Sequence, residues 1–82
     1  MRYHCEVYVR PRTDILDPQG DAVNTALANL GYGGVSDVKV GKYITLTIEA
    51  ADAASATQLV GEMCTKLLAN PIIEDFRIEV KD

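Results

Sequence analysis

Hydrophobic and polar residues alternate along three stretches of the chain, which is the period-two pattern of half-buried strands. The first stretch covers residues 3–10 and ends at Pro11, which cannot donate a hydrogen bond to a strand ladder. The second covers residues 37–49 and is interrupted by Gly41-Lys42, a pair that predicts a turn between two strands. The third covers residues 75–81. The pattern therefore predicts four strands.

Apolar residues recur at helical spacing in two other segments. The first segment opens with Asp17-Pro18, a capping carboxylate followed by the residue best suited to the first helical position, and it stops just before Gly31. The second opens with Asp52 as a cap and stops before Pro71. The positions expected to face the sheet are Ala22, Val23, Ala26, Leu27 and Leu30 in the first helix and Ala56, Leu59, Val60, Met63, Cys64, Leu67 and Leu68 in the second.

The order strand, helix, strand, strand, helix, strand predicts an α+β fold of the ferredoxin-like type, βαββαβ. In this fold a four-stranded antiparallel sheet carries two helices on one face. A chain of 82 residues has room for a single domain, 1–82. The last strand could pair within its own subunit or be exchanged with a neighbour, and the sequence leaves both possibilities open.

The second face of the predicted sheet has no helix to cover it. Tyrosines are enriched at protein interfaces, where the ring is buried and the hydroxyl finds a partner. We therefore expect a homodimer or homotetramer. The residues predicted to form its interface are Tyr8, Arg10, Tyr43 and Thr45.

Charge and hydropathy exclude several classes of partner. The net charge is -4 and the eight Lys and Arg residues are scattered, whereas nucleic acid binding needs a concentrated basic face. No run approaches the roughly 18 apolar residues that a membrane span requires. The first residues lead straight into strand alternation without a signal peptide, so a cytoplasmic protein is expected.

The chain offers little catalytic chemistry. His4 and Cys5 are neighbours in a strand, so they point to opposite faces and cannot share a metal. Cys64 belongs to an apolar helix stripe and is expected to be a reduced core residue. Arg10 and Arg12 flank a proline and could cradle a phosphate, but two solvated charges are the simpler interpretation. No catalytic residue and no metal ligand are predicted.

Four ordered motifs carry a resemblance to a known family. They are LDPQG at 16–20, LANLGY at 27–32, VKVGKYITL at 38–46 and LANPIIEDF at 68–76. Together they resemble the PurS family, the small subunits of phosphoribosylformylglycinamidine (FGAM) synthase. The match spans essentially the whole chain.

The resemblance implies a non-catalytic adaptor in de novo purine biosynthesis. The complete enzyme converts formylglycinamide ribonucleotide to the amidine with ATP, Mg and ammonia released from glutamine. A glutaminase subunit and a synthetase subunit use these compounds, so no cofactor is expected on this chain. The adaptor would bring the two larger subunits together, whereas the stoichiometry and any part in an ammonia route stay open.

The resemblance also singles out positions for partner contacts. Gly41 is explained by the predicted turn alone. Lys42 is either a solvated turn residue or pairs with a carboxylate or phosphate of a larger subunit, and Tyr43 could anchor that contact by burying its ring. The residues expected to contact the partner subunits are Asp17, Gln19, Gly41, Lys42, Tyr43 and Glu74.

Two alternatives have the same element order. An ACT-like regulatory module would bind a small effector near the first strand, but it is expected to have a tight glycine turn there, and Gly20 instead lies in the first helical turn. A small acyl phosphatase would need a glycine-rich phosphate cradle with an Arg and an Asn, and that cradle is missing.

Overall fold

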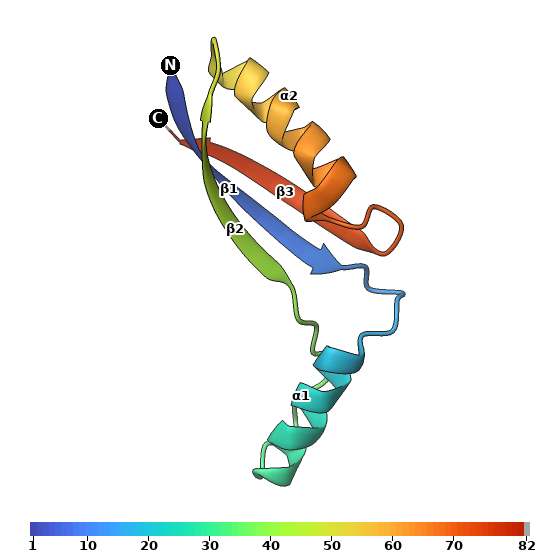
Figure 1. The fold of residues 1–82 in the computed structure, drawn as a ribbon. Coiled ribbons are helices and arrows are strands. Elements are labelled where there is room, and N and C mark those ends of the chain that lie inside the picture. Colours follow the sequence, from blue (N-terminus) through green and yellow to red (C-terminus); the bar gives the residue numbers. More distant parts are fainter. Residues whose placement is uncertain (82) are drawn as a thin grey trace.

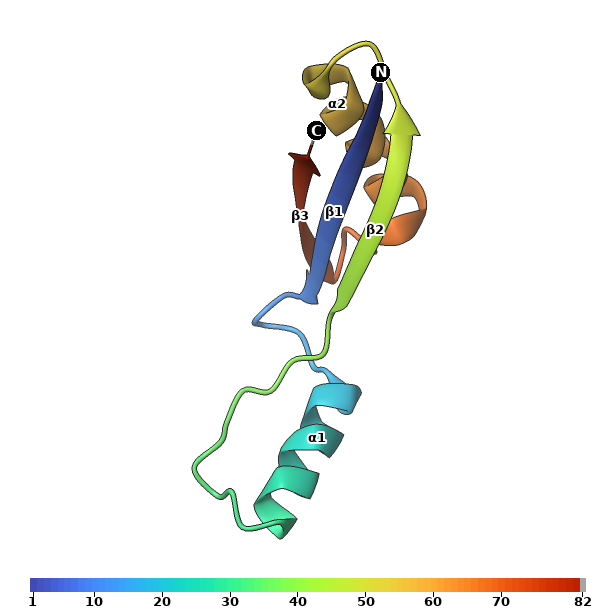
Figure 2. The same cartoon turned by 90° about the vertical axis from the view of Figure 1, so that its left-hand side faces the viewer.

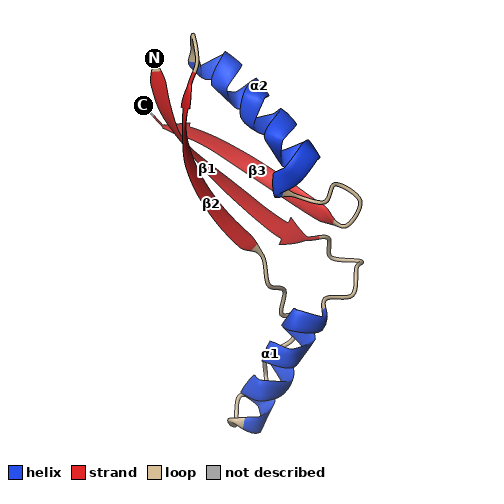
Figure 3. Cartoon of the chain, in the orientation of Figure 1, coloured by secondary structure: helices blue, strands red, loops and turns tan. Residues whose placement is uncertain are grey.

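The protein, described by a computed structural model over residues 1–81, has three strands and two helices. The strands form one antiparallel sheet in the order β2-β1-β3, and α2 covers one of its faces (Figures 1 and 3). A short π-helical turn, η1, continues α2. The elements are β1 (Arg2–Pro11), α1 (Pro18–Asn29), β2 (Lys42–Glu49), α2 (Ala53–Met63), η1 (Cys64–Leu68) and β3 (Glu74–Lys81).

The core lies between α2 and the central strand β1. Val7 of β1 is paired with Ile44 of β2 on one side and with Ile78 of β3 on the other. Because side chains alternate along a strand, every second residue of β1 points toward α2. β3 pairs with β1 of its own chain. Of the two possibilities left open for the last strand, the structure therefore has pairing within the subunit and not exchange with a neighbour. The fully or nearly fully buried apolar residues are Tyr3, Cys5, Val7, Val9, Ala56, Val60, Cys64 and Ala69.

The predicted helix signals at two positions are confirmed. The Asp52 carboxylate accepts a hydrogen bond from the Ser55 N–H at 2.7 Å, which caps α2. Gly31 has a φ of 102°, and the Tyr32 N–H donates to the Leu27 carbonyl at 2.9 Å in a Schellman arrangement. Both ends therefore follow from local sequence.

The predicted four-stranded ferredoxin-like sheet is not confirmed, because the sheet has three strands and residues 38–40 form none. The Val40 N–H donates instead to the Asp17 carboxylate at 2.8 Å, and the Lys39 ammonium donates to the Ile15 carbonyl at 3.0 Å. These bonds attach the segment to the start of α1. Within residues 1–81 this segment does not pair with β2, and the outer edge of β2 has no neighbouring strand.

Gly41 is likewise not part of a hairpin turn. A Cβ atom at this position would collide with the backbone carbonyl oxygen of Val9, where β1 passes closely. The glycine is required by this close approach at the entry to β2.

The prediction that both helices lie on the sheet is also wrong for α1. Figures 1 and 2 show α1 projecting beyond the end of the sheet, and its predicted core residues Val23 and Leu30 are 41% and 73% exposed. The Cα radius of gyration is 16.1 Å, whereas a compact chain of this length would have about 12 Å. We call residues 12–41 the arm. It points away from the sheet because its base is attached to the segment that enters β2.

Candidate functional site

The base of the arm is organised by a buried carboxylate. Asp17 is 8% exposed and accepts the Val40 N–H at 2.8 Å. That hydrogen bond is the main reason why the pKa of Asp17 is lowered, with smaller contributions from the N–H groups of Gly20 and Gln19 and from the charge of Lys39. These two N–H groups lie close enough to lower the pKa, but no full side-chain cap hydrogen bond to α1 is formed. The carboxylate attaches the returning chain instead.

We expect this carboxylate to make the protein acid-sensitive. Because the folded pKa of Asp17 lies below its unfolded value, the stabilisation is complete above the unfolded pKa and is lost as the pH falls through the folded one. In Asp17→Asn the amide oxygen can still accept the Val40 N–H, but it does not titrate. The measurement is the free energy of unfolding from about pH 7 to pH 3. Wild type should exceed the variant at neutral pH and converge with it in acid, and a constant difference would contradict the assignment.

A shallow cavity of about 190 Å³ lies where the arm meets the end of the sheet. It brings together three of the predicted partner-contact residues, Asp17, Gln19 and Glu74. Leu16, which also lines it, is 86% exposed, and Ile72 in the neighbouring loop is 78% exposed. Exposed apolar side chains around polar groups are typical of protein interaction sites. The remaining lining residues are Pro11, Ile15, Pro18, Val40 and Ile73.

Lys42 lies beside this cavity and is engaged within the chain. Its ammonium donates to the Leu68 carbonyl at 2.9 Å and lies 4.0 Å from the Glu74 carboxylate. Glu74 in turn accepts the Asn70 N–H at 2.7 Å. Lys42 therefore holds the connection between η1 and β3 in place, which neither of its two sequence interpretations anticipated.

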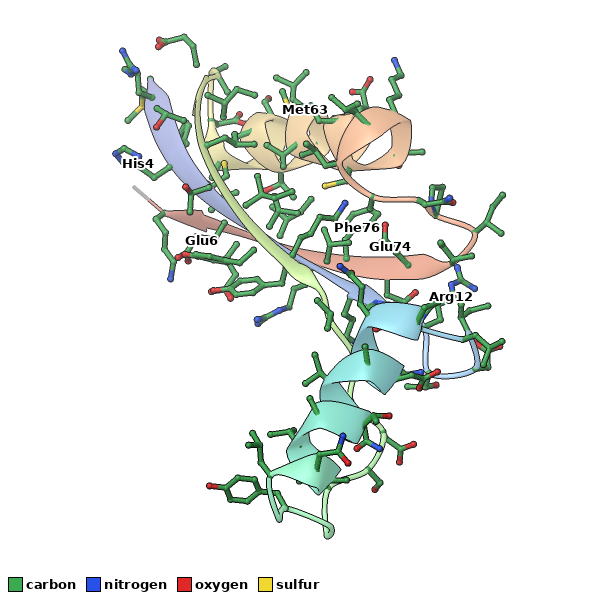
Figure 4. The ribbon with its side chains drawn as sticks, turned by 60° about the horizontal axis from the view of Figure 1, so that its bottom comes forward. His4, Glu6, Arg12, Met63, Glu74 and Phe76 are labelled. Carbon is green, nitrogen blue, oxygen red and sulfur yellow. The ribbon has the colours of Figure 1, made fainter. Side chains whose placement is uncertain are left out.

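Arg12 anchors the same connection from the arm, and sequence reasoning missed this. Its guanidinium donates to the Pro71 carbonyl at 2.8 Å and lies 3.5 Å from the Asp75 carboxylate (Figure 4). The predicted alternatives were a solvated charge and half of a phosphate cradle with Arg10. The only sequence signal for this role is the length of the Arg12 side chain, which can reach the backbone carbonyls of a distant loop.

Tyr43 is separated from Lys42, because neighbouring residues of β2 point to opposite faces. Its hydroxyl donates to the Glu6 carboxylate, and this hydrogen bond is the main cause that raises the pKa of Tyr43 to about 12. The Tyr8 ring lies 5.1 Å away, centroid to centroid. The predicted interface residues Tyr8, Arg10, Tyr43 and Thr45 thus share the polar face of the sheet, opposite α2.

The two cysteines are core residues, as predicted. Cys5 is 1% exposed and Cys64 is fully buried, and burial raises the pKa of both thiols. His4 lies on the opposite face, with its Nδ1 3.0 Å from the Thr47 hydroxyl (Figure 4). Within residues 1–81 no group of three His, Cys, Asp or Glu side chains could hold a metal ion. No helix in that range is long and apolar enough to cross a membrane.

An incompletely covered apolar surface, which we call the slot, is formed by residues of α2 and of the inner face of β2. Gly61 marks the side of α2 that faces β3, since a Cβ built there would lie 3.9 Å from Ile78. Leu59 and Met63 lie on the other side of the helix and are 41% and 37% exposed, and Figure 4 shows Met63 directed away from β3. Three half-buried residues of β2 form the floor. We define the slot by Ile44, Leu46, Ile48, Leu59 and Met63.

Comparisons with known proteins point to one family. The sequence model described as PurS, phosphoribosylformylglycinamidine (FGAM) synthase, matches residues 4–82. The PurS subunit from Synechocystis sp. is 53% identical over 95% of this chain and 78% of its own length. The solved structure of Bacillus subtilis PurS is 51% identical and has a TM-score of 0.88, covering 98% of this chain and 99% of that one. A chain in the structure of PurLQS from Thermotoga maritima is 26% identical with a TM-score of 0.85, covering 98% of both chains.

Proposed function

The chain belongs to the PurS family of FGAM synthase subunits, and from this premise we propose that it acts as the adaptor that brings the glutaminase and synthetase subunits together. The observation that carries the proposal is the likeness to a chain of the Thermotoga maritima PurLQS structure over 98% of both chains. A subunit role in a complex with other chains is common to this family. What we propose for this chain beyond that is the bridging of the two larger subunits and a part in the delivery of glutamine-derived ammonia.

The proposed adaptor is non-catalytic and leaves ATP, Mg and glutamine to the larger subunits. Its two thiols support this assignment because they are buried and their pKa values are raised, which keeps them protonated and unreactive. None of the comparisons favours an ACT-like regulatory module as the alternative.

We also propose that the adaptor is a homodimer in which α1 of each copy occupies the slot of the other. The slot lacks a helix at the place where the ferredoxin-like arrangement would have one. The arm carries the matching element, an amphipathic helix whose apolar stripe is largely exposed within residues 1–81. Reciprocal exchange of identical elements is a low-cost route to a dimer.

The shape of the chain supports this mode of assembly. The molecule extends over 51 Å in one direction and 14 Å in another. The high TM-score over 98% of the chain indicates that Bacillus subtilis PurS has the same extended outline. Exchange would also bring the segment before β2 of one copy near the free outer edge of β2 in the other, where the fourth strand was predicted.

The adaptor role is tested by Lys42→Ala in the complex reconstituted from this protein, the glutaminase and the synthetase. Loss of the two contacts of Lys42 should loosen residues 68–74 beside the shallow cavity. We expect weaker assembly, and glutamine-dependent synthesis should fall more than ammonia-dependent synthesis, because only the former needs both partners. Activities with the two nitrogen donors are measured in parallel with complex size.

Lys66→Ala is the matched control, because Lys66 is exposed on η1 and forms no salt bridge or side-chain hydrogen bond within residues 1–81. It should leave both activities unchanged. If wild-type protein fails to assemble with either larger subunit, the adaptor function itself is wrong.

A further inference from the structure

The polar face of the sheet carries an ordered patch of arginine and aromatic side chains. Tyr8 and Arg10 of β1 lie opposite Arg77 and Asp75 of β3 in the strand register. The Arg77 guanidinium lies over the Tyr8 ring, 4.3 Å from its centroid. These residues and Phe76 line a shallow cavity of about 350 Å³. Phe76 pairs with the core residue Val9, so its side chain points to the α2 face and not to this one. We call Tyr8, Arg10, Asp75 and Arg77 the Arg–Tyr patch.

The patch is held in place before any partner binds. Arg77 is fixed on its other side by the Glu79 carboxylate at 3.0 Å. The Tyr8 ring is flanked by Tyr43, which Glu6 holds by a hydrogen bond. Tyrosine and arginine dominate the energetics of protein interfaces, and an ordered side chain loses less entropy on binding.

Arg10 has binding capacity that the chain itself does not use. Its cross-strand neighbour is Asp75, but the Asp75 carboxylate lies 3.5 Å from Arg12. Within residues 1–81, Arg10 forms no salt bridge. An exposed guanidinium near an aromatic ring can take a carboxylate in a bidentate arrangement while the ring contacts a neighbouring side chain.

We propose that the Arg–Tyr patch docks an acidic segment of one of the larger subunits of the enzyme, with a carboxylate on Arg10 and an apolar side chain beside the Tyr8 ring. This inference rests on the proposed adaptor function. It departs from the sequence-based prediction that Tyr8 and Arg10 lie in the homo-oligomer interface. The reason is that exchange of α1 would bury the opposite face of the sheet and leave the patch free for a different chain.

The test compares Arg10→Glu with Arg2→Glu in the full complex. Both positions lie on the same face of β1 at opposite ends, so the charge change is matched. Reversal at Arg10 should weaken assembly by about tenfold or more, because it sets a carboxylate against a carboxylate. Reversal at Arg2 should leave the affinity within about twofold, as for a charge remote from the contact. Affinity is measured by sedimentation with each larger subunit, and the homodimer is measured separately.

Two results would overturn the inference. One is assembly of Arg10→Glu at wild-type affinity with both larger subunits. The other is dissociation of its homodimer, which would place the patch in the homo-oligomer interface instead. Tyr8→Ala gives an independent check, since loss of the ring should weaken assembly without charge repulsion. If the wild-type protein assembles with the larger subunits and these variants assemble equally well, the patch assignment fails while the adaptor function stands.

Discussion

Val23→Asp is expected to convert the proposed homodimer into a monomer. Val23 lies in the apolar stripe of α1 and is 41% exposed in the single chain, so a carboxylate there should hardly disturb the chain's own fold. In the proposed dimer the same side chain enters the slot of the other copy, where an unpaired charge is costly. Loss of such a buried contact costs about 2 to 4 kcal/mol, or a factor of roughly 30 to 1,000 in the dissociation constant. Light scattering at micromolar concentration measures the mass.

Thr25→Asp is the control for this prediction, because Thr25 lies on the opposite side of α1 and its replacement should leave the dimer intact. Leu46→Asp changes the other half of the contact, on β2, and should give the same monomer. A dimer that survives both Val23→Asp and Leu46→Asp would show that the slot is not the site of association. In that case Thr45→Asp, on the polar face, would test the interface that the sequence predicted.

Gly20→Ala is expected to destabilise the protein, although the same change stabilises most helices by about 1 kcal/mol. A Cβ at this position of α1 would collide with the carbonyl oxygen of Val38 and approach the Asp17 carboxylate to 2.9 Å. The backbone of residues 38–40 would have to move, and overpacking of this kind costs typically 1 to 3 kcal/mol. The free energy of unfolding in urea provides the measurement.

Gly33→Ala is the matched change, since nothing lies within 4 Å of a Cβ built at Gly33. It should be neutral or slightly stabilising. Gly20→Ala should push residues 38–40 away from the start of α1 and so break the hydrogen bond between the Val40 N–H and Asp17. It should therefore also remove the acid sensitivity assigned to Asp17. Equal stability of the two variants would show that residues 38–40 are not held against α1.

The elements that sequence reasoning predicted correctly are those determined by nearby residues. The alternation in β1 and β3, the Asp52 cap and the Gly31 stop all depend on interactions within a few positions. The fourth strand failed because the bonds that compete for it join Val40 to Asp17, far apart in sequence. The apolar stripe predicted for α1 is largely exposed in this chain, because the spacing of apolar residues does not tell what a helix face packs against.

The candidate site was predicted in part for the same reason. Asp17, Gln19 and Glu74 do line one cavity, although they come from distant segments. Lys42 and Tyr43 were grouped as a turn, and the strand that replaces the turn directs them to opposite faces. The contacts of Arg12 depend on the path of residues 70–75, which no periodic pattern encodes.

In the proposed dimer, the half-covered slot on β2 makes the stability of this small protein depend on its concentration. A chain whose sheet is completed by a second copy gains its last layer of core only through association. Its midpoint of thermal unfolding should then rise with protein concentration, and dilution alone should favour the unfolded chain. In a cell, the rate at which the adaptor is synthesised would set the share of copies that survive long enough to meet the larger subunits. Supply of the smallest chain thereby becomes a means of adjusting how much complete enzyme exists.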